Sequence, residues 1–100
     1  MATKRTNQIS IENVNIAGQS ERVDGDMYEA MKRAFLAILP KRSPGLTASE
    51  IRARVVVHLP EHLYPDGAKA GWWAKAVQLD LEAKRVVVRE KTKPLRWHKV

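Results

Sequence analysis

The chain has 100 residues, enough for one small domain, and its 18 lysine and arginine residues outnumber its 11 aspartate and glutamate residues, giving a net charge of +7. It has no cysteine, which excludes disulfides and thiolate metal sites. No apolar run approaches the roughly 18 residues that a membrane span needs, and no apolar segment follows the basic start of the chain as in a signal peptide. We therefore expect a cytoplasmic protein with no membrane partner.

The first 22 residues are predicted to form a flexible or extended N-terminal arm. Residues 1–8 are polar, and beyond them apolar side chains alternate with polar ones, with one break, at Ile9, Ile11, Val14 and Ile16. This pattern indicates an irregular strand, or an arm laid on the domain or on a neighbouring subunit. A homodimer formed through the arm is one expected partner arrangement. Gly18-Gln19-Ser20 is predicted as a loop.

Residues 23–100 are predicted to form a single domain that begins with a helix. Asp24 is a suitable N-cap, and the helix is expected to run to about Leu39, where Pro40 stops it. Its buried side follows helical spacing at Met27, Met31, Ala34, Phe35 and Ile38.

A second helix is predicted to begin at Thr47. Thr47 and Glu50 have the spacing of a capping box, in which each side chain bonds the backbone N–H of the other residue. Pro60 is expected to end this helix. In the connection that follows, Leu63 and Tyr64 are expected to anchor the chain to the core.

The third predicted helix, Gly67 to Lys84, is apolar over most of its circumference, which is typical of a central core helix. Asp66 is its expected N-cap. A narrow polar strip is expected to face solvent at Gly71, Lys75, Gln78 and Glu82.

Two adjacent tryptophans stand near the start of this helix. Neighbours on a helix point about 100° apart, so Trp72 and Trp73 cannot fill the same pocket. Trp73 is expected in the core. For Trp72 three environments stay open: packing under the N-terminal arm, lining a small cleft, or forming a subunit contact. The alternative is that both rings are simply core.

Asp80 interrupts the apolar side of the third helix, and a carboxylate there needs a partner. Lys84 lies one turn later, and Arg22 or Arg96 could reach it from outside the helix. We predict a partly buried ion pair that ties the helix to the C-terminal hairpin or to the N-terminal loop.

After Lys84 the apolar period changes from that of a helix to that of a strand. Val86 to Val88 is predicted as a strand, Glu90 to Pro94 as a turn and Leu95 to Val100 as the returning strand. The residues expected to face inward are Val86, Val88, Leu95 and Trp97. Those expected to face outward are Val87, Arg89, Arg96 and His98.

The order of these elements resembles the winged helix-turn-helix, an α+β fold with three helices and a C-terminal β-hairpin, the wing. In that fold a short strand before the second helix pairs with the hairpin, and here Gly45-Leu46-Thr47 would be that strand. Several runs also resemble a small family of uncharacterised bacterial proteins, which implies a winged-helix-like fold and no established activity. They include Tyr28-Glu29-Ala30-Met31, Gly67-Ala68-Lys69-Ala70-Gly71-Trp72-Trp73 and Thr92-Lys93-Pro94-Leu95-Arg96.

The positive charge is concentrated in the predicted hairpin. The last sixteen residues hold six cations against Glu90, a sum of +5, whereas residues 1–25 and 26–39 each sum to zero. A concentrated basic patch is the electrostatic footprint of a polyanion-binding surface. The alternative is a solvated basic hairpin that only aids solubility.

We therefore expect a DNA-binding winged-helix protein, a candidate transcriptional regulator with double-stranded DNA as its partner. Phosphate contacts are assigned to the wing at Arg89, Lys91, Lys93 and Arg96. Contacts from the third helix are assigned to Lys69, Lys75 and Gln78. The connection before that helix is about twice a helix-turn-helix turn, so the wing is expected to contribute most. The alternative is a protein-interaction or self-association module that uses the Trp72 side and the arm and binds no nucleic acid.

Enzyme chemistry is the least supported class of function. His58 and His62 are spaced like a helical ligand pair, but Pro60 lies between them and the metalloprotease glutamate is missing. The sequence also has no phosphate-binding loop, dinucleotide fingerprint or nucleophile elbow. We expect neither a catalytic residue, nor a metal, nor a cofactor.

Overall fold

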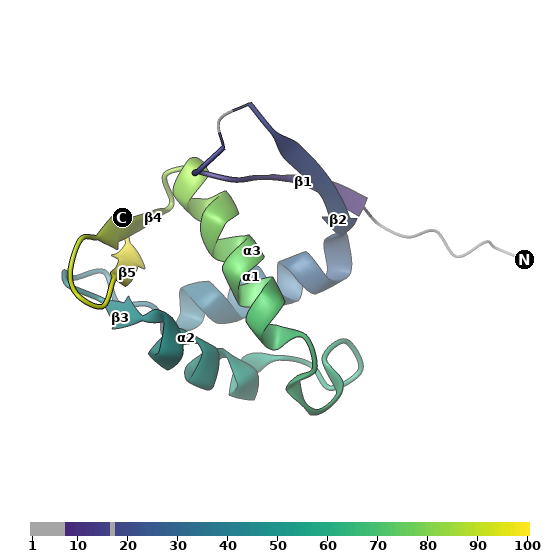
Figure 1. The fold of residues 1–100 in the computed structure, drawn as a ribbon. Helices are drawn as coiled ribbons and strands as arrows, with labels where there is room; N and C mark the ends of the chain where they lie inside the picture. The colour runs from purple at the N-terminus through teal and green to yellow at the C-terminus, as the bar shows by residue number, and fades with distance from the viewer. Residues whose placement is uncertain (1–7, 17) are drawn as a thin grey trace, which may run out of the picture.

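The structure, a computed structural model, describes residues 8–16 and 18–100. Three helices form the body of the domain: α1 (Gly25–Ile38), α2 (Ala48–Val55) and α3 (Ala70–Ala83). Two short 3-10 turns, Val56–His58 and Pro65–Gly67, lie between α2 and α3. Figure 1 shows α3 at the centre, with strands packed on it from both ends of the chain.

The strands form two small antiparallel sheets. β1 (Gln8–Glu12) pairs with β2 (Ser20–Asp24), and the second sheet has the order β3-β5-β4, built from β3 (Leu46–Thr47), β5 (Arg96–Lys99) and β4 (Val87–Glu90). The predicted α+β, winged-helix-like layout is confirmed, including the pairing of the short strand with the returning strand of the wing, where Leu46 lies opposite Trp97.

The core is shared by all three helices. Its fully buried side chains include Met31 and Phe35 of α1, Ile51 and Val55 of α2, and Val77 and Leu81 of α3. Tyr64 in the α2–α3 connection is 1% exposed, and its hydroxyl donates to the Met27 carbonyl at 2.7 Å. The prediction that this connection is anchored to the core is confirmed.

Two helix starts follow the local hydrogen-bond chemistry predicted for them. The Asp24 carboxylate accepts from the backbone N–H groups of Asp26 and Met27 at 2.9 and 3.2 Å. Thr47 Oγ1 accepts from the Glu50 N–H at 3.2 Å, and the Glu50 carboxylate accepts from the Thr47 N–H at 2.9 Å. Both predicted caps are confirmed. They could be predicted from the sequence because each cap joins residues within one helical turn.

The start of α3 differs from the prediction. Asp66 does not cap the helix: it lies in the 3-10 turn with a φ of 54°, and the helix begins at Ala70. Lys69, with a φ of 67°, is the residue at the N-cap, and it makes no side-chain cap bond. The hydrogen bond from Gly67 N–H to Tyr64 O, at 2.9 Å, closes a separate turn around Asp66, so the α-helix begins only after this turn.

The end of α3 sets the register of the wing. Arg85 has a φ of 62°, its N–H donates to Glu82 O at 3.1 Å, and Val86 N–H donates to Leu81 O at 2.9 Å. These two bonds make a Schellman turn. The turn buries Val87 and leaves Val86 37% exposed.

The predicted facing of the first wing strand was therefore wrong by one residue. Leu95, expected to face inward, is 39% exposed, and Val88 is half-buried, whereas Trp97 is buried as predicted. Arg96 and His98, expected to face outward, are half-buried. Three consecutive valines carry no alternation from which a strand register could be predicted.

The N-terminal segment is more regular than the predicted extended arm. β1 and β2 form a hairpin that packs on α3 and α1, with Ile11 and Val23 buried. The predicted loop at residues 18–20 is shorter, because Ser20 already pairs with Glu12. The part of the predicted arm in residues 1–7 lies outside the described residues, and dimerisation through the arm stays a prediction.

Candidate functional site

Two buried carboxylates on α3 fasten the two β-structures to it. Asp80 is 0% exposed, and its carboxylate lies 2.8 Å from Lys84 Nζ. It also accepts from the Glu12 N–H at 2.8 Å and from the Tyr28 hydroxyl. The predicted Asp80–Lys84 pair is confirmed. Neither Arg22 nor Arg96 joins it, since Arg22 bonds Gln8 and Arg96 bonds Gly45 O. Burial, together with the bond to Asp80, raises the pKa of Tyr28.

The second carboxylate, Glu82, was expected on the exposed strip and is instead 6% exposed at its side chain. It accepts from Trp97 Nε1 at 3.0 Å, from Gln78 Nε2 at 2.9 Å and from Arg89 Nη2 at 3.2 Å. Arg89 Nε lies 3.0 Å from its other oxygen as an ion pair without hydrogen-bond alignment. The three-stranded sheet covers this side of α3, which a helical pattern alone cannot show.

The structure divides the seven predicted nucleic-acid residues into four groups. Gln78 is 5% exposed and bonded to Glu82, so the prediction that it faces solvent was wrong. Arg89 is held by Glu82, and Arg96 Nη1 donates to Gly45 O at 3.0 Å and lies 3.6 Å from Glu50. Lys69 at the N-cap and Lys75 on α3 are exposed, and Lys91 and Lys93 are exposed in the wing turn.

A second basic turn, the loop between α1 and β3, lies against β5 and was not among the segments predicted to bind DNA. Lys99 N–H donates to Pro40 O at 2.8 Å, and Arg96 reaches Gly45, so the loop after α1 runs along β5. Figure 1 shows this loop and the β4–β5 turn at the same end of the molecule. The exposed cations of the two turns, Lys41, Arg42, Lys91 and Lys93, are called the wing patch below.

The wing patch has no ion-pair partner among residues 8–16 and 18–100, because the acidic side chains nearest to it in the sheet are already occupied. Glu50 pairs with Arg96, and Glu90 lies 2.8 Å from His98 Nε2. The Lys99 carbonyl and then Glu90 raise the pKa of His98. The sequence alone could not predict this patch, because its two turns are about fifty residues apart in the chain and are linked through the β3–β5 pairing.

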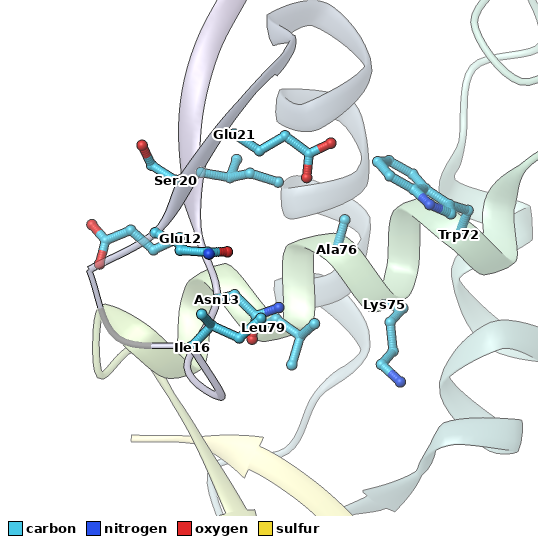
Figure 2. Close-up of a pocket in the computed structure, with 11 residues that line it drawn as sticks. Glu12, Asn13, Ile16, Ser20, Glu21, Trp72, Lys75, Ala76 and Leu79 are labelled. Atoms are coloured by element: carbon cyan, nitrogen blue, oxygen red, sulfur yellow. The ribbon is translucent and has the colours of Figure 1, made fainter.

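Trp72 lies at a cleft between the N-terminal hairpin and α3. The ring is 54% exposed, whereas Trp73 is 6% exposed, so the prediction for Trp73 is confirmed and the alternative that both rings are core was wrong. The cleft has a volume of about 320 Å³. Figure 2 shows Trp72 and Lys75 on the α3 wall and Glu12, Asn13 and Glu21 on the hairpin wall.

Two further features concern the described part of the chain only. No helix there is long and apolar enough to cross a membrane. No three histidine, aspartate or glutamate side chains of residues 8–16 and 18–100 gather as they would around a metal ion.

Comparison with known proteins places the chain in a family and goes no further. No curated protein and no solved structure matches it. Residues 8–97, which run from β1 through all three helices to the first half of β5, match a family of unknown function, DUF6958. The chain therefore belongs to this family.

Proposed function

We propose that the protein binds double-stranded DNA through the wing patch, chiefly by contacts to phosphates. The observation that carries the proposal is that four exposed cations, Lys41, Arg42, Lys91 and Lys93, lie in two turns that both adjoin the three-stranded sheet. Cations that neutralise DNA phosphates release condensed counterions, and this release drives binding without reading sequence.

The architecture supports a fixed placement of these cations. β5 lies between β3 and β4, so both turns are attached to one strand. Arg96 spans from β5 to Gly45 O at 3.0 Å, and Lys99 Nζ donates to Leu36 O at 3.0 Å. These bonds hold the loop and the wing together, which limits the ordering cost when both meet one backbone.

The exposed part of α3 favours backbone contact over base reading. Of the three positions in the third helix region assigned to DNA, Gln78 is buried, Lys75 lines the cleft, and Lys69 is the N-cap residue of α3. Phosphate contacts position a protein, and base-edge contacts specify the sequence. We therefore expect weak preference among duplex sequences.

A fluorescence anisotropy titration with a labelled 20-base-pair duplex at 50 and 200 mM salt tests the proposal. The wild-type affinity is expected to fall by more than tenfold between the two. In Lys91→Gln/Lys93→Gln, the slope of log K against log salt should become shallower by about 2, roughly 1 for each phosphate contact removed.

The matched control is Arg22→Gln/Arg33→Gln, which removes the same charge from β2 and α1 and should leave the slope within experimental error of wild type. Absence of duplex binding at 50 mM salt would exclude the proposal and favour the protein-interaction module. Equal losses in the two double variants would mean that net charge, rather than the wing patch, governs binding.

A further inference from the structure

We propose that the cleft between the β1–β2 hairpin and α3 binds a small organic cation, an amine or quaternary ammonium carried on an apolar body. Its volume of about 320 Å³ is within the range of small-molecule sites. Its apolar surface comes from both walls: Ile11 and Ile16 from the hairpin, and Trp72, Ala76 and Leu79 from α3.

Strand register points one carboxylate into this cleft. Ile11 lies opposite Glu21 in the β1–β2 pair, and directly paired residues share a face of the sheet. Ile11 is 5% exposed against α3, so Glu21 stands on the same, inward face. In Figure 2 the Glu21 side chain extends toward Trp72. Glu21 has no ion pair among the described residues and keeps its acceptors for a ligand.

Trp72 offers an aromatic surface to the same space. Its ring packs edge-on against Trp73, with centroids 5.0 Å apart and planes at 82°. Trp73 is buried, so this contact orients a ring that is itself 54% exposed. A cation near the face of a tryptophan is attracted by its quadrupole, most strongly where water is partly excluded.

The charge of the cleft selects the sign of the ligand. Three ionisable residues line the cleft, Glu12, Glu21 and Lys75, but Glu12 follows the buried Ile11 in β1, so its side chain points to the opposite face of the hairpin. Figure 2 shows Lys75 pointing away from the space between Glu21 and Trp72. That space therefore meets a carboxylate and an aromatic ring, the pair of groups that recognises an organic ammonium.

NMR titration of the ¹⁵N-labelled protein with benzyltrimethylammonium and with 3-phenylpropylamine tests the inference. Both probes should bind in the low millimolar range or tighter, and the largest shifts should fall on Glu21, Trp72 and Leu79. The isosteric carboxylate 3-phenylpropanoate should bind at least tenfold more weakly.

Variants separate the two recognition groups. Glu21→Gln and Trp72→Leu should each raise the dissociation constant of the ammonium probes at least fivefold, and Trp72→Phe should raise it less, because phenylalanine keeps an aromatic face. The matched control Asp26→Asn, at an exposed carboxylate outside the cleft, should stay within twofold of wild type. Circular dichroism checks that every variant is folded.

The inference is overturned if neither ammonium probe saturates by 20 mM. It is equally overturned if the carboxylate probe binds as well as the amine, or if Glu21→Gln and Trp72→Leu leave binding unchanged. The proposed DNA binding is independent of these outcomes, since the wing patch shares no residue with the cleft.

Discussion

The two hairpins that pack on α3 are held there by the same kinds of contact, but the surfaces beside them carry opposite charge. Each is tied by a carboxylate of the helix, a polar aromatic group and a cation near that aromatic ring. Asp80 accepts from Tyr28, with Lys84 Nζ 5.9 Å from the ring centroid. Glu82 accepts from Trp97, with Arg89 Cζ 5.9 Å from the ring centroid.

The two ties differ in how many segments they join. Asp80 links α3 to α1 and to the backbone of β1, and it is 0% exposed. Glu82 receives both its aromatic and its cationic partner from the wing. Hence the Asp80 tie supports the whole fold, and the Glu82 tie chiefly supports the wing. The surfaces diverge accordingly, with an acidic apolar cleft beside the N-terminal hairpin and a basic patch on the wing.

The largest effect is expected at Asp80. Asp80→Ala leaves the Glu12 N–H, the Tyr28 hydroxyl and Lys84 without their acceptor, so the free energy of unfolding should fall by about 3–5 kcal/mol. Urea denaturation followed by circular dichroism measures it. Tyr28→Phe, which removes one partner and keeps the ring, should lose less. A loss below about 1 kcal/mol for Asp80→Ala would contradict this account of the network.

Glu82→Ala should cost less, about 2–3 kcal/mol, because Arg89 can turn its guanidinium to water while the Trp97 N–H loses its acceptor. Hydrogen exchange distinguishes the two ties. Amides of β4 and β5 should exchange faster in Glu82→Ala, with β1 and β2 unchanged. Faster exchange in both hairpins would show that the wing is not a separate unit of stability.

Arg85→Gly should stabilise the protein by about 0.5–1 kcal/mol. Arg85 is held at a φ of 62° in the Schellman turn that leads to the wing, and glycine adopts this conformation without steric cost. Thermal unfolding measures the gain. Ala83→Gly, two residues earlier and inside α3, is the control and should destabilise by up to about 1 kcal/mol. A loss of stability in Arg85→Gly would mean that the turn is not under strain.

The smallest effect is a pH dependence carried by His98. Its two ring nitrogens lie 2.8 Å from Lys99 O and from Glu90 Oε2, so the charged ring donates to both, and its pKa is raised. The stabilisation is fully present below the ordinary pKa of about 6.5 and is lost as pH rises through the higher folded value. Wild type should lose less than about 1 kcal/mol over that interval, and His98→Gln should not. Identical pH profiles would remove His98 as the cause.

Features that depend on one or two turns of chain followed from the sequence. The Asp24 cap, the Thr47–Glu50 box and the Asp80–Lys84 pair each join residues no more than four apart, so local geometry determines them. Helical angle alone also separated Trp73 from Trp72. The element order predicted the three helices, the wing and the strand that joins it.

What the sequence alone determined was the three helices and the wing, the caps of the first two helices, and the Lys84 partner of Asp80. Tertiary structure decided which side of each element is covered. It covered Glu82 with the sheet, buried Gln78, shifted the wing register at Arg85, and set the hairpin beside Trp72. The physical reason is that burial depends on contacts between residues far apart in the chain, and neither periodicity nor charge encodes which segment will cover a given face.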